Sequence, residues 1–357
     1  MNNILNEDLT YIYSSIHNIS EKFSGSNIFI TGCCGFLGYY FLNFFNKYKH
    51  ELNINKIIAI DNFQVGKPDW LEELTEQNIE LIEFDIIKGD INSIVADKNN
   101  SFVIHMASIA SPVFYRKYPI QTIEANIWGL KKLLDLYKDE NLKGFLFFSS
   151  SEIYGDPLPN FIPTEESYRG NVNTIGPRAC YDESKRFGET ICYEYAKVYN
   201  LPITIVRPFN NYGPGMKLND KRVPADFASA VIKNEDIVIL SDGTPTRTYC
   251  YVADAISGYL KALLYGKFDV FNIGIEKPEI SVLELAKIYQ ECGKKLFNYS
   301  GKISYQKSQE NNYLTDNPNR RCPVIKKAQK LLAYAPKTSV EVGVERFLRY
   351  IQQEENK

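Results

Sequence analysis

Along the first half of the chain, short apolar runs alternate with longer segments whose apolar residues recur every three to four positions. The runs are rich in β-branched and aromatic residues, which is typical of strands, and the longer segments have helical spacing. Strands are predicted at 27–31, 57–60, 79–84, 101–105, 144–148 and 203–206. Helices are predicted after the first strand, at 119–139 and around Tyr181. Strands that alternate with helices predict a parallel sheet covered on both faces.

These strands end in polar or small residues. Asp61 ends the second strand, Asp85 follows the third, and three serines follow the fifth. The carboxyl ends of parallel strands lie at one edge of the sheet, and open α/β sheets bind ligands there. We therefore expect a binding site along this edge.

After residue 207 the pattern changes. Loops rich in glycine, proline and asparagine separate helices predicted at 225–233, 252–264, 282–292 and 340–353. The predicted fold class is α/β, with a Rossmann-type doubly wound parallel sheet and a smaller mixed C-terminal substrate domain. The expected parts are an N-terminal helical extension at 1–24, a Rossmann domain at 25–207 and the smaller domain at 208–357. The last two are expected to interleave, because a short strand at 270–273 can return to the first sheet.

The first 24 residues carry apolar side chains at a helical spacing. These side chains are Leu5, Leu9, Ile12, Ile16, Ile19 and Phe23, in a stretch that is otherwise polar and acidic. A signal peptide needs a charged start and an apolar block, so this pattern favours a helix packed on the body of the protein. No apolar run is long enough to span a bilayer, and no membrane partner is expected.

Charge and metal-binding residue types narrow the function classes. The net charge of -2 gives no basic field, so no nucleic-acid partner is expected. The 7 cysteines form no Cys-x-x-Cys pair, and a reduced cytoplasmic compartment accounts for them most simply. The 3 histidines, His17, His50 and His105, have no ligand-like spacing, so no metal site is expected.

A glycine-rich turn follows the first predicted strand. Gly32, Gly35 and Gly38 stand between that strand and an aromatic-rich helix. Such glycines let the chain turn tightly, let the backbone approach a pyrophosphate and let the helix pack on the strand, while the helix N-terminus offers free N–H groups to phosphates. Asp61 lies where an acid holds a ribose 2′-hydroxyl, which favours NAD over NADP. Lys67 follows closely and leaves that preference open.

A tyrosine and a lysine stand four residues apart in the segment 176–186. On a helix, Tyr181 and Lys185 lie on one face. An ammonium close to a phenol lowers the pKa of the phenol, and such a tyrosine can remove a proton from a sugar or alcohol hydroxyl. This spacing is common by itself, and it gains meaning from the dinucleotide-binding turn in the same chain.

Four segments resemble the extended short-chain dehydrogenase/reductases that modify nucleotide sugars. They are 107–112, 150–157, 173–186 and 219–223, and the similarity runs from 27 to 350. Within this family the segments are most similar to the UDP-glucuronate decarboxylases, which make UDP-xylose. The resemblance implies NAD as the cofactor, a UDP-sugar as the favoured substrate and a function in surface-polysaccharide sugar biosynthesis. It also implies a homodimer with a four-helix seam built from helices 119–139 and 178–198.

The resemblance implies roles for individual residues. The residues expected to contact NAD are Gly32, Gly35, Phe36, Leu37, Gly38, Asp61, Asn62, Asp85, Ile86, Ala107, Ser108, Asn126, Tyr181 and Lys185. The expected catalytic residues are Tyr181, Lys185, Ser150, Glu152 and Arg321. The residues expected to contact the nucleotide sugar are Ser151, Asn210, Arg222, Arg247 and Arg321. Arginine forks suit the phosphates and the carboxylate of such a substrate.

Related reactions stay open beside decarboxylation. A 4,6-dehydratase usually carries an acid where Ser151 stands, and a 4-epimerase usually carries a small residue where Glu152 stands, so both are disfavoured. A 4-dehydrogenase that stops at the keto sugar is a third alternative. A non-catalytic NAD-binding regulator is an alternative of another class, and the intact Tyr181, Lys185 and Ser150 speak against it.

Four positions depart from the pattern of the decarboxylases. Gly215 stands where they usually have arginine, Arg169 where an aromatic residue is common, Val324 in place of an aspartate and Ser150 in place of a threonine. The arginine lost at 215 and the arginine gained at 169 leave both the sugar and the nucleotide open.

Overall fold

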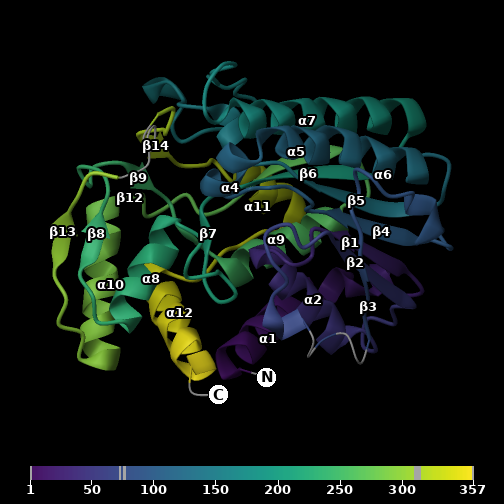
Figure 1. Cartoon of the computed structure of the whole chain (residues 1–357). Coiled ribbons are helices and arrows are strands. Elements are labelled where there is room, and N and C mark those ends of the chain that lie inside the picture. The colour runs from purple at the N-terminus through teal and green to yellow at the C-terminus, as the bar shows by residue number, and fades with distance from the viewer. Residues whose placement is uncertain (1, 72–73, 75–77, 309–314, 356–357) are drawn as a thin grey trace.

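The computed structural model describes residues 2–71, 74, 78–308 and 315–355 of the chain. Its centre is a 7-stranded sheet in the order β11-β6-β5-β4-β1-β2-β3 (Figure 1). Its strands are β1 (Asn27–Thr31), β2 (Lys56–Asp61), β3 (Glu80–Glu83), β4 (Ser101–His105), β5 (Leu142–Phe148), β6 (Ile203–Pro208) and β11 (Asp269–Ile273). All neighbouring pairs run parallel. The strand order turns between β1 and β4, which is where open α/β sheets bind ligands.

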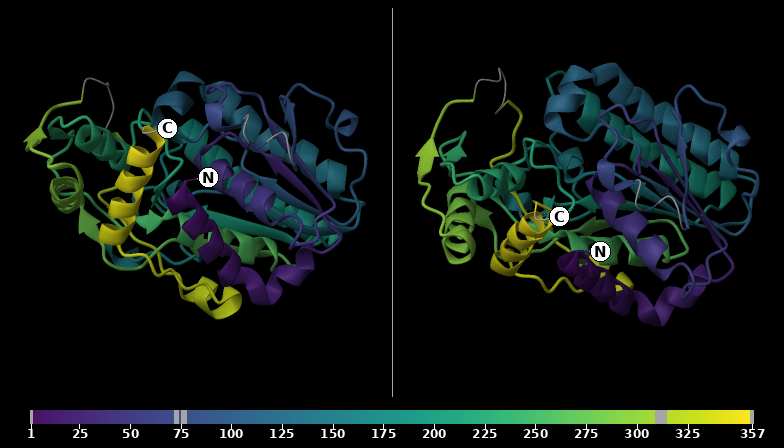
Figure 2. Two further views of the ribbon diagram at one scale, coloured as in Figure 1. Left: turned by 90° about the horizontal axis from the view of Figure 1, so that it is seen from below. Right: turned by 60° about the horizontal axis from the view of Figure 1, so that its bottom comes forward.

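Helices cover both faces of this sheet (Figures 1 and 2). α5 (Pro119–Glu124), α6 (Leu130–Tyr137) and α7 (Ala179–Tyr199) lie over one face, and α1 (Asn3–Ile16), α2 (Phe36–Tyr48) and α9 (Val252–Leu263) lie over the other. The side chains of β1 alternate between the two layers, with Ile28 and Ile30 in one core and Phe29 in the other. The predicted Rossmann-type doubly wound sheet is confirmed.

The C-terminal half builds a smaller mixed part from short elements. Its strand pairs are β7 (Asn211–Tyr212) with β10 (Cys250–Tyr251), β8 (Ile237–Ile239) with β13 (Ile303–Tyr305), and β9 (Thr246–Arg247) with both β12 (Ile280–Ser281) and β14 (Arg320–Arg321). Its helices are α8 (Val223–Ile232), α10 (Val282–Phe297), α11 (Lys326–Leu332) and α12 (Val340–Glu355). Strands of two or three residues are too short to leave a periodic pattern, so the sequence did not predict them. As expected, 270–273 returns to the first sheet, where β11 pairs with β6.

The helix predicted at 119–139 is interrupted. A π-helical turn, η4 (Ala125–Gly129), separates α5 from α6. Asn126 lies in this turn with an exposure of 0%, and its Nδ2 donates a hydrogen bond to Ser184 Oγ on α7 at 2.8 Å. Asn126, which the sequence placed in a regular helix, therefore lies in a π-helical turn with its side-chain amide buried against α7.

The remaining short elements connect the layers. They are α4 (Pro112–Lys117) and the 3-10 helices η1 (His17–Phe23), η2 (Asp69–Leu71), η3 (Ile91–Ser93), η5 (Ser151–Tyr154) and η6 (Pro159–Phe161). η5 matters most for the site, because it follows β5 directly and carries Glu152. Ser150 caps it, with its hydroxyl oxygen accepting the Glu152 N–H at 3.2 Å.

The N-terminal helix packs on the body of the protein, as predicted. Its buried Asp8 accepts hydrogen bonds from the hydroxyls of Tyr40 and Tyr251, each at 2.7 Å, and from the Arg346 guanidinium at 2.7 Å. Arg346 lies on α12, so this carboxylate ties the first helix to the last one, and both chain ends lie at the same side in Figure 1. Burial tends to raise the pKa of Asp8, and these donors oppose that shift.

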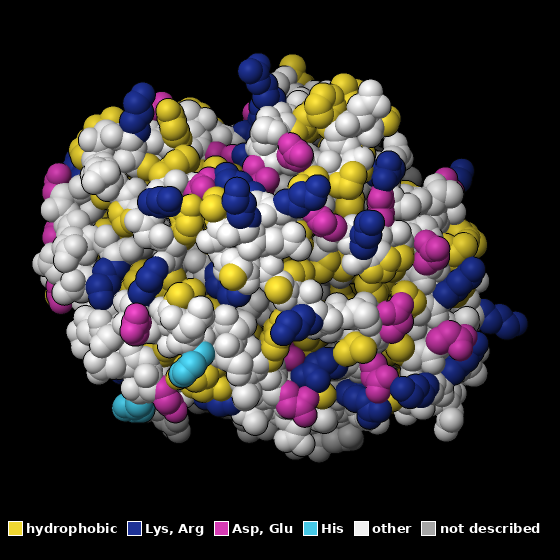
Figure 3. Space-filling view, turned by 180° about the vertical axis from the view of Figure 1, so that it is seen from behind, with side chains coloured by type: hydrophobic (Ala, Val, Ile, Leu, Met, Phe, Trp, Pro, Cys, Tyr) yellow, Lys and Arg dark blue, Asp and Glu magenta, His cyan; other side chains and the backbone are white. Residues whose placement is uncertain are grey.

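The distribution of surface charge agrees with the net charge near zero. Acidic and basic side chains are interspersed over the face shown in Figure 3. All 7 cysteines are free thiols. Within the described ranges, no helix combines the length and the apolar character that crossing a bilayer requires.

Candidate active site

A cavity of about 520 Å³ opens at the carboxyl edge of the sheet, and its walls come from both halves of the chain. The predicted site residues that line it are Gly32, Gly35, Phe36, Leu37, Gly38, Asp61, Asn62, Asp85, Ile86, Ala107, Ser108, Ser150, Ser151, Glu152, Tyr181, Lys185, Asn210, Arg222 and Arg247. Asn126 and Arg321 are not part of the wall. The fold therefore brings most of the residues predicted for cofactor and substrate into one space.

The glycine-rich turn leaves no room for side chains at two of its three glycines. Gly32 has φ +68°, and a Cβ there would lie 2.5 Å from the Ala107 nitrogen. A Cβ on Gly38 would lie 2.1 Å from the Cys33 carbonyl oxygen, because α2 packs directly on the turn. α2 starts after Gly35, which provides no side-chain cap, so its first N–H groups are open to phosphates. The turn fits the pyrophosphate of a dinucleotide.

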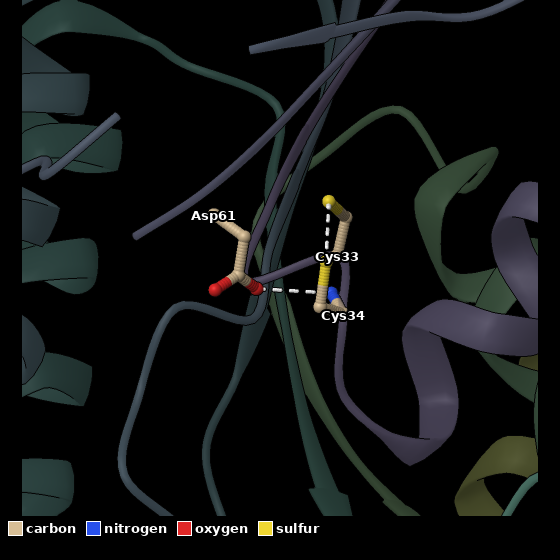
Figure 4. A group of neighbouring side chains, drawn as sticks. All are labelled: Cys33, Cys34 and Asp61. Atoms are coloured by element: carbon tan, nitrogen blue, oxygen red, sulfur yellow. Dashed lines mark hydrogen bonds between the residues drawn. The ribbon is translucent and has the colours of Figure 1, made fainter. Parts of the chain in front are cut away.

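Asp61 lies beside this turn at the end of β2 (Figure 4). Its Oδ2 accepts the backbone N–H of Cys34 at 2.9 Å, and its Oδ1 accepts that of Phe63 at 2.9 Å. The Cys33 and Cys34 sulfur atoms are 3.8 Å apart, and with Asp61 they form the cluster of potential metal ligands in the described residues. The hydrogen bond with Cys34 and burial raise the pKa of the Cys33 thiol far above its usual value.

Tyr181 enters the cavity from the first turn of α7. Its ring stacks on Tyr115, with centroids 5.2 Å apart and an interplanar angle of 13°. Burial raises the pKa of the Tyr181 phenol, while a hydrogen bond with the Ser150 hydroxyl and the charge of Arg222 act in the opposite direction. The sequence-based expectation that Lys185 lowers the pKa of Tyr181 is therefore wrong in this structure, where burial dominates.

Lys185 explains why the expected effect is missing. Its Nζ lies 5.8 Å from the centre of the Tyr181 ring and donates to the Phe148 carbonyl oxygen at 2.7 Å. Burial lowers the pKa of the Lys185 amine to about 7. The amine is thus only partly protonated near neutral pH, and an uncharged amine cannot stabilise a phenolate.

The lowered pKa of Lys185 predicts that the contribution of this residue to stability grows as the pH rises above neutral. In the unfolded chain a lysine keeps its proton up to about pH 10.4, whereas in the folded protein the pKa is about 7. Between these values the unfolded state binds more protons at this residue, so the contribution of Lys185 to the free energy of unfolding rises with pH, by up to about 1.4 kcal/mol per pH unit. Denaturant unfolding from about pH 7 to about pH 9 measures this slope.

A matched pair of variants assigns the slope to this residue. Lys185→Met should give a slope that is lower than the wild-type slope by up to about 1.4 kcal/mol per pH unit, because the titrating amine is gone. Lys197→Met removes an exposed lysine from the same helix and should keep the wild-type slope. Equal slopes in the wild type and Lys185→Met would contradict the assignment.

Glu152 is the centre of a buried charge cluster. Its Oε2 accepts hydrogen bonds from Arg178 Nη2 and, at 2.8 Å, from Arg321 Nη2. Burial opposes the charge of Glu152, yet the nearby guanidinium groups outweigh it and hold the pKa of this carboxyl below its usual value. In order of effect these groups are those of Arg178, Arg321 and Arg247. Glu152 is therefore ionised at neutral pH and acts as a hydrogen-bond acceptor.

Arg247 lines the cavity from β9. It donates to three backbone carbonyl groups and to Asn317 Oδ1. Burial lowers the pKa of Arg247 to about 10, and the charge of Arg321 adds to the effect. The acceptors around Arg247 are neutral groups, so its charge suits an anionic ligand such as a diphosphate.

Arg222 and Asn210 line the same side of the cavity. Arg222 Nε donates to Asp220 Oδ2 at 2.8 Å, so its charge is already paired. Asn210 has φ +42° and donates from Nδ2 to the Thr248 carbonyl oxygen at 3.0 Å. A substrate phosphate would compete with Asp220 for Arg222, whereas Asn210 keeps its amide oxygen for a ligand hydroxyl.

Among the wall residues that the sequence reasoning missed, Arg178 and Tyr115 lie beside the predicted catalytic groups, and two predicted residues lie behind the wall. Arg178 and Tyr115 line the cavity, while Arg321 contacts the wall from behind through Glu152 and the Ser151 carbonyl oxygen, and Asn126 supports α7. Arg178 precedes Tyr181 by three residues, so the helical spacing that paired Tyr181 with Lys185 would have indicated it. Tyr115 lies far from Tyr181 in the chain and leaves no local signal.

Comparisons with known proteins agree with this geometry. A model of the NAD dependent epimerase/dehydratase family matches residues 28–274. UDP-glucuronic acid decarboxylase 5 of Arabidopsis thaliana is 36% identical over 328 residues, which cover 91% of this chain and 89% of the relative. Two longer decarboxylases of the same plant match over about two thirds of their length.

Solved structures show the same architecture with ligands bound. The UDP-glucose 4-epimerase of Thermotoga maritima with UDP-glucose is 26% identical with a TM-score of 0.78, covering 92% of this chain and 99% of that one. The UDP-glucuronic acid 4-epimerase of Bacillus cereus with UDP-glucuronic acid and NAD is 26% identical with a TM-score of 0.75 and the same coverage, 92% and 99%.

Proposed function

Since this chain belongs to the NAD-dependent epimerase/dehydratase family, we propose that it decarboxylates UDP-glucuronate to UDP-xylose through a 4-keto intermediate. The observation that carries this proposal is the meeting of a phenol–hydroxyl pair, Tyr181 and Ser150, with the ionised Glu152 in one cavity wall. The similarity to UDP-glucuronic acid decarboxylases supports the same substrate.

The proposed roles follow from the chemistry of these groups. The glycine turn and Asp61 would hold NAD, which when bound would supply the acceptor for the C4 hydride and return it at the end of the reaction. In its phenolate form, which the positive charge of bound NAD would favour against burial, Tyr181 removes the proton of the C4 hydroxyl, and the Ser150 hydroxyl, which hydrogen-bonds with the phenol, stabilises the oxygen that is left. Lys185 would hold the nicotinamide ribose beside them.

The carboxylate leaves because oxidation at C4 makes the sugar a β-keto acid. Such an acid loses carbon dioxide readily, since the electrons spread into an enolate whose oxygen Tyr181 and Ser150 can stabilise. Glu152, being ionised, does not supply the proton to C5 itself but can accept a hydrogen bond from a ring hydroxyl or from a water, and such a water would give C5 the proton that replaces the lost carboxylate. Elimination of water instead would need an acid at position 151, where a serine stands.

We further propose a division of labour along the chain. Residues 25–207 bind NAD, residues 208–357 bind the nucleotide sugar, and 1–24 brace the fold. The supporting observation is that the glycine turn and Asp61 lie on the first part, whereas Arg222 and Arg247 reach the cavity from the second.

Mass spectrometry of purified enzyme with UDP-glucuronate tests the reaction. We expect a product lighter by carbon dioxide without added NAD, because the cofactor is regenerated and should copurify. Loss of water would identify a dehydratase, an unchanged mass with a new NMR spectrum an epimerase, and a mass lower by two hydrogens with NADH formation a dehydrogenase. Unchanged UDP-glucuronate at high enzyme concentration would refute the proposed reaction. A panel of UDP-, GDP-, CDP- and dTDP-sugars would then identify the true substrate.

We also propose a homodimer that acts in the cytoplasm in surface-polysaccharide sugar biosynthesis. Large apolar side chains are exposed on adjacent helices, with Trp128 in η4 exposed by 53%, and Phe187 and Val198 on α7 by 49% and 66%. Exposed apolar surface of this kind marks an interface. The free thiols suit a reducing compartment.

Light scattering after size exclusion should give twice the chain mass of 41.0 kDa. A charge placed in the interface, as in Phe187→Glu, should give monomers, because an unpaired charge would be buried there. Val342→Glu puts a charge on an exposed site of α12 and should leave the mass unchanged. A wild-type protein that elutes as a monomer would refute the dimer.

A further inference from the structure

Arg178 occupies an unusual place in the cavity wall. It is the residue before α7 and is only 8% exposed, yet it lines the cavity three residues ahead of Tyr181. Its Nη2 donates to Glu152 Oε2, and its Nε lies 3.5 Å from Asp182 Oδ2. The guanidinium thus joins the helix that carries the catalytic tyrosine to the short helix that carries Glu152.

The two arginines that bind Glu152, Arg178 and Arg321, approach its carboxylate from different sides. Arg321 is 1% exposed, lies outside the cavity wall and spends Nη1 on the Ser151 carbonyl oxygen, so it holds Glu152 from behind. Arg178 approaches from the cavity side. Both donate to the same oxygen, Oε2, and within the described residues no protein group is hydrogen-bonded to Oε1. The pair therefore leaves one oxygen of the carboxylate unused by the protein.

We propose that Arg178 is a positioning residue: it clamps Oε2 of Glu152 against Arg321, so that the carboxylate cannot rotate and Oε1 is presented to the substrate. This inference rests on the role that Glu152 has in the proposed function. A carboxylate held by one arginine alone could turn about its last torsion, which has a broad energy minimum. Two guanidinium groups on one oxygen remove that freedom and give charge-assisted bonds.

Asp182 holds Arg178 in turn. Asp182 lies in the first turn of α7, four residues after Arg178, which is the N-cap residue of that helix, and at this spacing the two side chains meet. Burial, with the charge of Glu152, raises the pKa of Asp182 to about 7. Arg178 Nε and Asp182 Oδ1 are buried without a hydrogen-bond partner in the described part of the chain, so the pair keeps bonding capacity for a ligand or a water.

The pKa of Glu152 can be measured, and it would change if Arg178 acts on Glu152 through its charge but not if Arg178 only fills space. The charged and titratable groups facing it are Arg178, Asp182 and Tyr181 from α7, Arg321 from β14, Arg247 from β9 and Tyr115 from α4. Arg178 is the strongest of the groups that lower its pKa, while burial raises it. Removing Arg178 should therefore raise the pKa of Glu152, and the acid limb of the kcat profile should move to higher pH.

The experiment compares Arg178→Met and Arg178→Lys with the wild type. In Arg178→Met, kcat should fall about 10²-fold with KM nearly unchanged, because a misplaced catalytic group costs about that much. Arg178→Lys should recover part of the loss, since an ammonium keeps the charge but lacks the planar fork. Carboxyl NMR of protein labelled at glutamate, with Glu152→Gln to assign the signal, should show a higher titration midpoint in Arg178→Met.

Controls separate this inference from the proposed function. Arg349→Met breaks an exposed ion pair with Glu345 on α12 by the same chemical change and should leave kcat and the titration as in the wild type. If the wild type does not decarboxylate UDP-glucuronate, the proposed function fails, and the NMR titration still decides on Arg178. Should Arg178→Met not fold, Arg178→Lys carries the test. A wild-type titration of Glu152 in the variant, or a loss confined to KM, would overturn the positioning role.

Discussion

Replacing Tyr181 by phenylalanine is expected to abolish turnover while the fold and the bound dinucleotide persist. The change removes one oxygen and keeps the ring, which stacks on Tyr115 at a centroid distance of 5.2 Å. General acid–base groups contribute about 10²–10⁴-fold to rate, so product formation should fall by at least that range. Decarboxylation followed by mass spectrometry measures the loss, and the absorbance of NAD released on denaturation shows that the cofactor is retained.

The matched control lies on the same helix. Tyr193→Phe removes the hydroxyl of a tyrosine that is 45% exposed and faces away from the cavity wall, so it should turn over as the wild type does. Turnover of Tyr181→Phe within about tenfold of the wild type would mean that another group takes the proton. That result would remove the basis of the proposed mechanism.

Replacing Gly38 by alanine is expected to disrupt both stability and cofactor binding. A Cβ at this position would lie 2.1 Å from the Cys33 carbonyl oxygen and 2.5 Å from its carbonyl carbon, which are backbone atoms that cannot swing aside. α2 would have to move away from β1, and overpacking of this kind costs about 3 kcal/mol of unfolding free energy. The same movement shifts the helix N-terminus that faces the phosphates. Urea denaturation and NAD titration measure the two effects.

Gly35→Ala separates the two effects. A Cβ on Gly35 would lie 3.7 Å from the Gly32 carbonyl oxygen, an ordinary contact distance, so the protein has room for it. The alanine should therefore leave the unfolding free energy without NAD nearly unchanged but weaken NAD binding, because the methyl group stands where the pyrophosphate approaches the turn. If Gly38→Ala proved as stable as Gly35→Ala, the tight packing of α2 on the turn would be refuted.

Sequence reasoning reached the strands and helices of the first half because their signals are local. The apolar runs that become β1, β2, β4, β5 and β6 differ from helical segments in length, in period and in their content of β-branched and aromatic residues. The helix predicted at 119–139 shows the limit of this reasoning. The π-helical turn at η4 depends on Asn126 meeting Ser184 on α7, a contact between residues 58 apart in the chain.

At the site, the sequence predicted which residues meet better than it predicted their pKa values. Tyr181 and Lys185 do lie on one face of α7, but the expected lowering of the tyrosine pKa fails. Burial governs both groups, raising the pKa of the phenol and lowering that of the amine. How deeply a side chain is buried depends on every segment packed around it, so the spacing of two residues cannot give the sign of a pKa shift.

By itself the sequence determined the parallel α/β sheet, the dinucleotide-binding turn and the identity of the groups that can act on a nucleotide sugar. The sheet and the turn follow from hydrophobic periodicity and from the backbone freedom of glycine, which are properties of short segments, whereas the groups that act on the sugar were implied by the resemblance to a known family. Only the tertiary structure decided that Arg178 and Arg321 share one oxygen of Glu152, since Arg321 comes from a strand 169 residues away. The charge of a buried carboxylate is set by which cations folding brings within a few ångströms, and no local pattern records that.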